Sequence, residues 1–451
     1  MFTKIHSVSI NWLEGAGIEV EVDVASGMPN FCIVWLPDAA IQESKERVRT
    51  AIINSWFFFP WTRITVNLAP ADIKKKWPSF DLAIAIWILW AEMGFDKKYL
   101  SNSIFLWELA LDWKLRPISS ILPSVIFAKD KWFKHVFIPM ENKDEASLIP
   151  WINIIPVEWL DEIIEILLRN KKPVIAEPMK IEDIIDLKCA WDMIDFESVL
   201  WQEQAKRALL IAASGWHNIL MEWPPWSGKT MLAKAFASIL PKMEISEIIE
   251  VSKIYSVAWL LSKREPLVFK RPFRRIHHTA SAVSIVWWWR DSRPWEISLA
   301  HKGVLFLDEF LEFETKLVEM LRQPIEDGEI TINRINASYR YPAKFILIWA
   351  LNPCPCWYLG DKEKNCICAQ WSIEKYRKKL SWPILDRIDI FINVPRVKIE
   401  DFDVPKNKKS TSEELKAKVE KARVFQLERF SWLDKTFNSE MSNKEIDKFC
   451  A

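Results

Sequence analysis

Two groups of residues in this 451-residue chain have the types and spacing needed to bind and cleave a phosphate chain. The first is Gly228-Lys229-Thr230, which follows an apolar run at 218–221 and precedes a helical pattern at 231–240. A tight turn between a strand and a helix presents backbone N–H groups to phosphate oxygens, and a lysine adds positive charge. The second group is Asp308-Glu309, which ends the apolar run 304–307. One carboxylate at such a strand end can hold Mg²⁺, and the next can polarise a water molecule.

The predicted phosphate loop differs from the complete P-loop pattern at its first position, where Trp223 replaces the required glycine. Glycine at 223 and 226 would give GPPGSGKT, which is a complete Walker A sequence. We expect Thr230 and Asp308 to hold Mg²⁺, Lys229 to contact the β- and γ-phosphates of ATP, and Glu309 to activate water. The alternative, a chance Gly-Lys-Thr at a helix start, is disfavoured by the strand–loop–helix context. The predicted ATP-binding residues are Trp223, Pro224, Pro225, Trp226, Ser227, Gly228, Lys229, Thr230 and Asp308.

Two further polar residues are candidates for the same chemistry. Asn352 follows the apolar strand pattern at 345–351 and could orient the attacking water; otherwise it is a turn residue. Arg387 lies in the sequence Leu-Asp-Arg-Ile-Asp. On its own it would be assigned to a surface ion pair. In a ring-shaped ATPase it would reach the nucleotide of a neighbouring subunit.

Four cysteines lie close together, and they predict a zinc site with a structural role. They are Cys354, Cys356, Cys366 and Cys368. Four thiolates in a short span suit tetrahedral Zn²⁺, although the spacing is C-x-C rather than C-x₂₋₄-C. The alternative is a set of reduced loop cysteines without metal.

Composition excludes several classes of protein. Half of the residues are apolar and 27% are charged, so the chain is globular rather than disordered. The longest apolar stretch, 82–91, is about half a membrane span, and the N-terminus lacks a signal-peptide pattern. Seven cysteines without a secretory signal favour a reducing cytoplasm. A net charge of +1 predicts no polybasic tail and leaves a local nucleic-acid groove open.

Strand and helix patterns alternate along the chain, which predicts an α/β fold. We expect strands at 18–24, 63–68 and 135–138, and helices at 38–54, 81–93, 160–168 and 411–430, the last with Ser412 as N-cap. The predicted domains are 1–170, a linker at 171–192, an ATPase domain at 193–400 and a helical segment at 401–451.

These motifs together resemble the magnesium-chelatase-like AAA+ ATPases of the YifB/ComM family over nearly the whole chain. The segments that carry the resemblance are Arg275–Thr279, Glu296–His301, Arg322–Gly328, Asn352–Cys356 and Leu385–Asp389, and near the N-terminus Ala69–Asp72 and Glu108–Asp112. The resemblance implies an N-terminal Lon-protease-like α/β domain without proteolytic activity, followed by an AAA+ domain and a partial helical lid. No Ser–Lys dyad is evident; Ser44-Lys45 lies on an amphipathic helix, where both residues are expected to be solvated.

The resemblance further implies a hexameric ring that hydrolyses ATP and acts on DNA, as a helicase or in branch migration. The basic stretches Lys74–Lys76, Lys263-Arg264, Lys270-Arg271 and Arg274-Arg275 are candidate phosphate contacts or solvated faces. The alternatives are a protein-remodelling magnesium chelatase subunit, a Lon-like ATP-dependent protease, and a nucleotide-gated binding module without turnover.

Tryptophan stands at nearly every position where the family has glycine. The chain holds 27 Trp and only 9 Gly, whereas about 32 Gly are typical of this length. The family glycines written as Trp are positions 35, 107, 113, 201, 216, 223, 226, 287, 288, 289, 295, 357 and 382. This pattern predicts UGA decoded as Trp where the native code specifies Gly. The family also continues into a longer lid, so the resemblance implies that the chain ending at Ala451 is a fragment.

Overall fold

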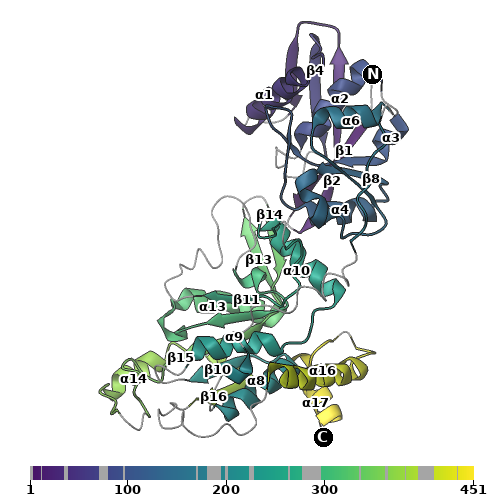
Figure 1. Ribbon diagram of the computed structural model, residues 1–451. Coiled ribbons are helices and arrows are strands. Elements are labelled where there is room, and N and C mark those ends of the chain that lie inside the picture. The colour runs from purple at the N-terminus through teal and green to yellow at the C-terminus, as the bar shows by residue number, and fades with distance from the viewer. Residues whose placement is uncertain are drawn as a thin grey trace. The chain divides into compact units, whose positions relative to one another are not determined.

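A computed structural model describes the chain over residues 4–11, 13–34, 39–70, 80–94, 97–168, 171–179, 195–198, 202–222, 228–262, 265–276, 296–334, 337–360, 364–380, 382–394, 411–433 and 435–450. The chain divides into two compact units (Figure 1). Unit 1 comprises residues 1–187 and 252–268, and unit 2 comprises 188–251 and 269–451. The predictions for Lys74–Lys76, Trp223–Ser227, Lys263-Arg264 and Trp287–Trp289 lie outside the described residues.

Unit 1 is built on a seven-stranded mixed sheet with strand order β3-β4-β2-β1-β5-β8-β9. The β1–β2 and β2–β4 pairs are antiparallel and the others are parallel. The strands are β1 (Lys4–Asn11), β2 (Glu14–Ala25), β3 (Asn30–Val34), β4 (Arg63–Ala69), β5 (Ser103–Phe105), β8 (His135–Pro139) and β9 (Asn153–Val157), with the small pair β6 (Glu108–Leu109) and β7 (Leu115–Arg116). The helices are α1 (Ala39–Asn54), α2 (Asp81–Met93), α3 (Lys97–Ser101), α4 (Ile121–Asp130), η2 (Met140–Asn142), α5 (Lys143–Ala146) and α6 (Leu160–Leu167).

Helix α2 forms the centre of the unit 1 core, because it is apolar on all sides. It ends at a glycine. Residues 82–89 are fully buried, as expected of such a helix. Gly94 has φ 67° and donates its N–H to the Trp90 carbonyl at 2.8 Å, which closes the last turn. The sequence prediction of this helix and of strand 63–68 is confirmed.

A buried polar group joins α1 to the start of α2. Asp81 accepts hydrogen bonds from the Ser44 hydroxyl at 2.5 Å and from the Arg47 guanidinium at 2.8 Å. Ser44 is fully buried, so the prediction that it is solvated was wrong. Lys45 is half-buried, and the helical pattern did not reveal the partner that draws Ser44 inward.

Unit 2 contains a five-stranded parallel sheet with strand order β11-β12-β15-β10-β16 and a separate hairpin. The strands are β10 (Ile219–Glu222), β11 (Phe273–Ile276), β12 (Val304–Leu307), β15 (Ile346–Leu351) and β16 (Ile390–Asn393), and the hairpin is β13 (Glu329–Arg334) with β14 (Ala337–Pro342). The helices are η3 (Phe196–Ser198), α8 (Glu203–Gly215), α9 (Lys229–Ile239), α12 (Glu296–Leu299), η4 (Phe310–Glu312), α13 (Thr315–Asp327), α14 (Gln370–Arg377), α15 (Trp382–Leu385), α16 (Ser412–Arg429), η6 (Asn438–Glu440) and α17 (Asn443–Cys450). Helix α10 (Ile245–Val257) begins in unit 2, and its last residues belong to unit 1. Strands β12 and β15 are buried throughout, as in parallel sheets covered on both faces.

The helix predicted at 411–430 is α16, and its N-cap lies one residue before the predicted Ser412. Thr411 is the N-cap of α16 and accepts the Glu414 backbone N–H at 3.3 Å. Ser412 is therefore not the cap; its hydroxyl instead contacts Asp195 at 3.0 Å and Ser238 at 2.9 Å. These contacts tie the start of α16 to Asp195, which precedes η3, and to α9.

Tryptophan occupies an unusual share of left-handed backbone positions. Ten described non-glycine residues have positive φ, and seven of them are Trp: 56, 113, 132, 151, 216, 259 and 357. Trp216, for example, ends α8 with φ 62° and ψ 44°, a position that favours glycine. The backbone therefore places Trp where a side chain is costly, which supports the hypothesis that these positions are glycine in the native protein.

Across the described part of the chain, no helix combines the length and apolar character needed to cross a membrane.

Candidate functional site

Parallel strands bring several of the predicted site residues to one edge of the unit 2 sheet. Residue 222 of β10 lies opposite residue 351 of β15, so Asn352 follows at the carboxyl edge. Lys229, the first residue of α9, donates from its ammonium to the Asn352 side-chain oxygen at 2.5 Å. Gly228 caps the helix with φ 76°, so glycine suits this turn. Thr230 is the second residue of α9 and is partly exposed.

Two carboxylates complete this charged group. Burial lowers the pKa of Lys229, whereas the charges of Asp308 and Glu309 raise it. The Asp308 carboxylate accepts the Glu309 backbone N–H at 3.1 Å and the Arg275 guanidinium at 2.8 Å. Lysine, carboxylates and amide thus converge at one sheet edge, an arrangement suited to a phosphate chain and a hard cation.

Glu309 holds a strained conformation. Its φ is 53° and ψ is 47°, in the left-handed region, and it directly precedes η4. Such strain in a non-glycine residue is concentrated at functional sites, where the surrounding structure holds it in place. This backbone signal is not visible in the sequence.

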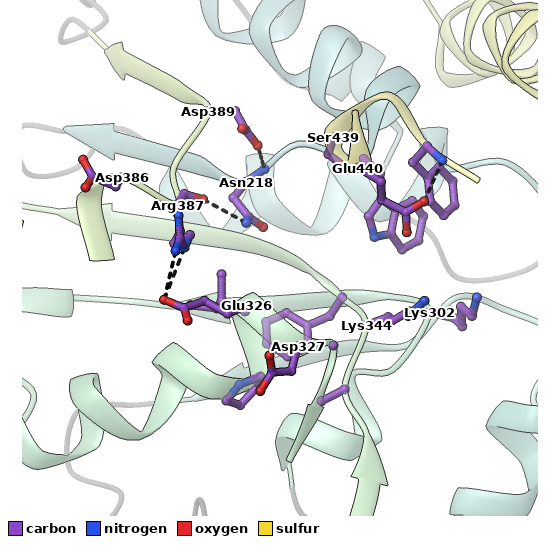
Figure 2. A pocket seen from close by; sticks show the side chains of 17 residues that line it. Asn218, Lys302, Glu326, Asp327, Lys344, Asp386, Arg387, Asp389, Ser439 and Glu440 are labelled. Carbon is purple, nitrogen blue, oxygen red and sulfur yellow. Dashed lines mark hydrogen bonds and ion pairs between the residues drawn. The ribbon is translucent and has the colours of Figure 1, made fainter. Parts of the chain in front are cut away.

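Arg387 lies at the opposite edge of the same sheet. Asn218, which precedes β10, donates its side-chain N–H to the Arg387 carbonyl at 3.1 Å, and its backbone N–H to Asp389 at 3.0 Å (Figure 2). The Arg387 guanidinium pairs with Glu326 at 3.2 Å beside a cavity of about 500 Å³. The structure therefore does not bring Arg387 to Lys229 of its own chain.

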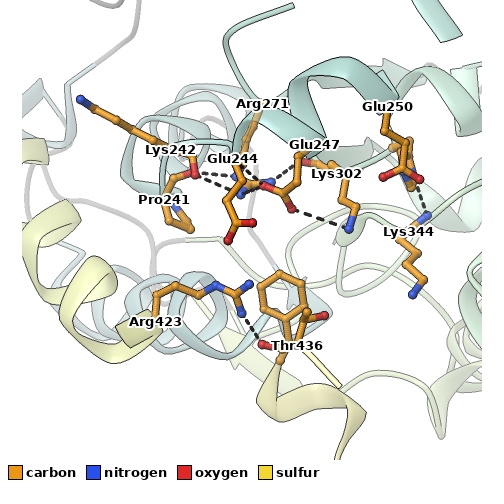
Figure 3. A network of polar contacts seen from close by, with 12 residues as sticks. Pro241, Lys242, Glu244, Glu247, Glu250, Arg271, Lys302, Lys344, Arg423 and Thr436 are labelled. Carbon is orange, nitrogen blue, oxygen red and sulfur yellow. Dashed lines mark hydrogen bonds and ion pairs between the residues drawn. The ribbon is translucent and has the colours of Figure 1, made fainter. Parts of the chain in front are cut away.

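The basic residues of β11 and its entry are engaged within the protein. Arg271 is 7% exposed and donates to the Pro241 carbonyl at 2.7 Å, the Lys302 carbonyl at 2.8 Å and the Glu247 carboxylate at 2.8 Å (Figure 3). Arg274 pairs with Glu296 through two bonds of 2.5 and 2.6 Å. The suggestion that Arg271 contacts nucleic-acid phosphates was therefore wrong. Sequence analysis also missed Arg275 as the partner of Asp308; the parallel β11–β12 pair, which ends at residues 276 and 307, places them side by side.

The four cysteines form one cluster. Their Sγ atoms lie within 4.8 Å of one another, and three of the pairs are 3.4, 3.5 and 3.7 Å apart. Burial raises the pKa of the Cys354 thiol to about 12. For Cys356, burial is outweighed by hydrogen bonds from the backbone at Tyr358 and Ile367, which lower its pKa to about 6. The cluster lies directly after Asn352.

Comparison with known proteins agrees with this architecture. The family model described as magnesium chelatase, subunit ChlI, matches residues 195–402, and a second model, subunit ChlI of Mg-chelatase, matches 20–142. The competence protein ComM of Haemophilus influenzae is 38% identical over 438 residues, which cover 96% of this chain and 83% of that protein. The protein YifB of Escherichia coli is 35% identical over 449 residues, 99% of this chain and 85% of the relative.

The chain belongs to the YifB/ComM family of magnesium-chelatase-like AAA+ ATPases. Similarity to the magnesium-chelatase 38 kDa subunit of Rhodobacter capsulatus is more limited, with 29% identity over 174 residues, 35% of this chain and half of that protein. The YifB/ComM family thus accounts for both units, whereas this chelatase subunit matches only part of the chain.

Proposed function

We propose that this chain binds and hydrolyses ATP at the carboxyl edge of the unit 2 sheet. The observation that carries the proposal is the 2.5 Å contact between Lys229 and Asn352, beside the carboxylates of Asp308 and Glu309. Lys229 binds the β- and γ-phosphates, and Asn352 orients the attacking water. Glu309 accepts the proton of that water as it attacks the γ-phosphorus; the bond from this phosphorus to the β–γ bridging oxygen breaks, and ADP and phosphate leave.

Thr230 and Asp308 would hold Mg²⁺, which neutralises charge on the phosphate oxygens when it is bound. The Asp308 carboxylate fits a hard cation, and its Arg275 partner is 42% exposed. Because one Asp308 oxygen now faces Arg275, the cation and this guanidinium compete for the same carboxylate.

Three variants test the proposed hydrolysis. Lys229→Ala is expected to abolish binding of a fluorescent ATP analogue. Glu309→Gln is expected to keep binding and to lower kcat by about a hundredfold or more, because the general base is lost. Glu314→Gln, an exposed carboxylate close in sequence, is the matched control and should change neither quantity. Equal activity of Glu309→Gln and the control would contradict the assignment.

We further propose a ring of six copies in which Arg387 completes the site of a neighbour. The support is its position at the sheet edge opposite Lys229. Arg387→Ala and Glu309→Gln should each be inactive alone. When the two variants are mixed, sites that combine an intact Glu309 with a neighbour's intact Arg387 should recover activity. Mixtures that stay inactive, although they assemble, would argue against the shared site.

DNA is the proposed substrate, as a helicase or in branch migration. The support is the family, which includes a relative named as a competence protein. Addition of single-stranded, duplex or branched DNA should raise the ATPase rate, and Glu309→Gln should abolish the increase. A rate unchanged by every DNA would favour the alternative, a magnesium chelatase subunit that remodels a protein partner. Peptide cleavage would favour the protease alternative.

The cysteine cluster is proposed to hold one Zn²⁺. Tetrahedral zinc with Zn–S distances of about 2.3 Å requires sulfur atoms about 3.8 Å apart, close to the observed separations. Backbone hydrogen bonds that favour a thiolate at Cys356 suit a metal ligand. Metal analysis of the full chain should find about one zinc, lost in Cys354→Ser and retained in Cys32→Ser. The site would be refuted if the protein contained no zinc while all of its cysteines were reduced.

A further inference from the structure

Helix α14 begins two residues after Cys368, the last cysteine of the cluster. The helix lies at one end of unit 2, near the label of β15 in Figure 1. Arg377, at its end, and Lys379, two residues beyond it, each contact a residue next to the candidate site. No motif in the sequence pointed to this helix.

The first contact reaches the entry to the phosphate loop. The Arg377 guanidinium lies 2.9 Å from the carboxylate of Glu222. Glu222 is the last residue of β10, and residue 223 begins the predicted Walker A segment. This ion pair fixes the strand end from which the loop departs. Because Arg377 is half-exposed, the pair adds little to overall stability. Its effect is therefore on local position.

The second contact reaches the segment after Glu309. The Lys379 ammonium donates to the Leu311 carbonyl at 2.6 Å, and Leu311 belongs to η4, which starts directly after Glu309. The ring of Tyr376, on the last turn of the same helix, is buried. Burial raises the pKa of the Tyr376 phenol, and the carboxylates of Glu312 and Glu309 raise it further.

We propose that α14 is a brace, anchored by the cysteine cluster, in which Arg377 and Lys379 are positioning residues for the carboxyl end of β10 and for Glu309. The two contacts join one helix end to the strand before the predicted phosphate loop and to the turn after Glu309. Strain in a backbone such as that of Glu309 persists only where the surrounding structure holds it, and Lys379 contributes to this through η4. The inference rests on the proposed ATPase activity and on the proposed zinc site.

Variants at the helix end separate positioning from folding. Arg377→Ala should weaken binding of a fluorescent ATP analogue about threefold to fivefold, the range of a lost exposed ion pair. Arg377→Lys should restore most of the affinity. Reversal of the pair in Arg377→Glu with Glu222→Arg should recover it better than either single change. Lys379→Met should lower kcat about tenfold with an unchanged Kd, because a carbonyl loses its charged donor.

Lys378→Ala is the matched control, since it removes one positive charge from the same turn and its side chain is exposed. The control should leave Kd, kcat and thermal stability unchanged. The proposal would be overturned if Arg377→Ala and Lys379→Met had the same Kd and kcat as Lys378→Ala. So would variants that lower the unfolding temperature while Kd and kcat stay at their original values.

Hydrogen exchange tests the anchor without an activity measurement. Removal of zinc from the full chain by a chelator should speed amide exchange in residues 309–312 and 370–377, but not in the buried strand 346–351. Exchange unchanged in 309–312 would overturn the coupling. If the protein binds no zinc, only the metal proposal fails, and the substitutions still decide the brace. If the protein binds ATP but does not hydrolyse it, the ATPase proposal fails. The Kd values of the Arg377 variants would still test the proposed role of α14.

Discussion

Replacement of Trp56, Trp132 or Trp151 by glycine is predicted to cost unit 1 almost no stability, whereas glycine at an ordinary exposed position is destabilising. These three residues have φ of 63°, 63° and 74°, in the left-handed region. A residue with a Cβ loses about 1–2 kcal/mol there relative to the right-handed conformations. Their side chains are 94%, 89% and 90% exposed, so the indoles add little packing that a glycine would remove.

The expected change combines three quantities. Burial of about a tenth of an indole surface of roughly 250 Å², at about 25 cal/mol per Å², contributes about 0.6 kcal/mol, which the substitution removes. Glycine also makes the unfolded chain more flexible, at a cost of about 0.5–1 kcal/mol. Relief of backbone strain offsets both losses, so each substitution should change the free energy of unfolding by less than about 1 kcal/mol. Seven such Trp residues together cost about 7–14 kcal/mol, as much as the whole stability of an ordinary domain.

The assay is equilibrium urea unfolding of the full chain, followed by far-UV circular dichroism at constant m-value. Trp61→Gly is the control, because Trp61 is 69% exposed and is not among the described residues with positive φ. That substitution should lower stability by about 2–3 kcal/mol, because it removes the burial of about a third of the indole, adds flexibility to the unfolded chain and relieves no strain. A Trp56→Gly variant destabilised as much as Trp61→Gly would refute the reasoning. Intact mass of the protein from its own cells then decides which residue is native.

Further predictions concern charged groups. Burial raises the pKa of Glu145 to about 7, so the folded state keeps a proton that the unfolded state loses from about pH 4.5. The free energy of unfolding should therefore fall as the pH rises to 7. Glu145→Gln should remove this pH dependence and add about 3 kcal/mol at pH 8, measured by urea unfolding. Asp81→Ala should destabilise unit 1 by about 3 kcal/mol, because it leaves Arg47 without its buried partner; a loss under 1 kcal/mol would contradict this. Arg275→Ala should tighten magnesium-dependent nucleotide binding by freeing Asp308, and a weaker affinity would show that the arginine itself contacts the nucleotide.

The sequence predicted that Lys229 and Asn352 lie at one edge of a sheet, since that placement depends on local order. Apolar strands that end in polar residues must gather those residues at one edge when the strands are parallel, and Lys229 and Asn352 meet there. Buried helix α2 was equally clear from its continuous apolar run.

Other features depend on partners distant along the chain and could not be predicted. Arg271 binds carbonyls 29–31 residues away and the carboxylate of Glu247. It is therefore buried, although the Lys270-Arg271 pair predicted an exposed position. Ser412 likewise lost its expected cap role because Asp195, 217 residues earlier, binds its hydroxyl. Hydropathy patterns carry no information about such long-range pairs.

The path of the chain has a practical consequence for dissection of the protein. Unit 1 includes residues 252–268, which the chain supplies only after it has begun unit 2. Glu145, half-buried in unit 1, accepts a hydrogen bond from Ser256 at 2.5 Å. A fragment that stops at residue 187 would therefore lack Ser256 and expose the surface that it covers. The two units cannot be separated by one cut, and exchange of either unit between relatives requires two segments to be transferred together.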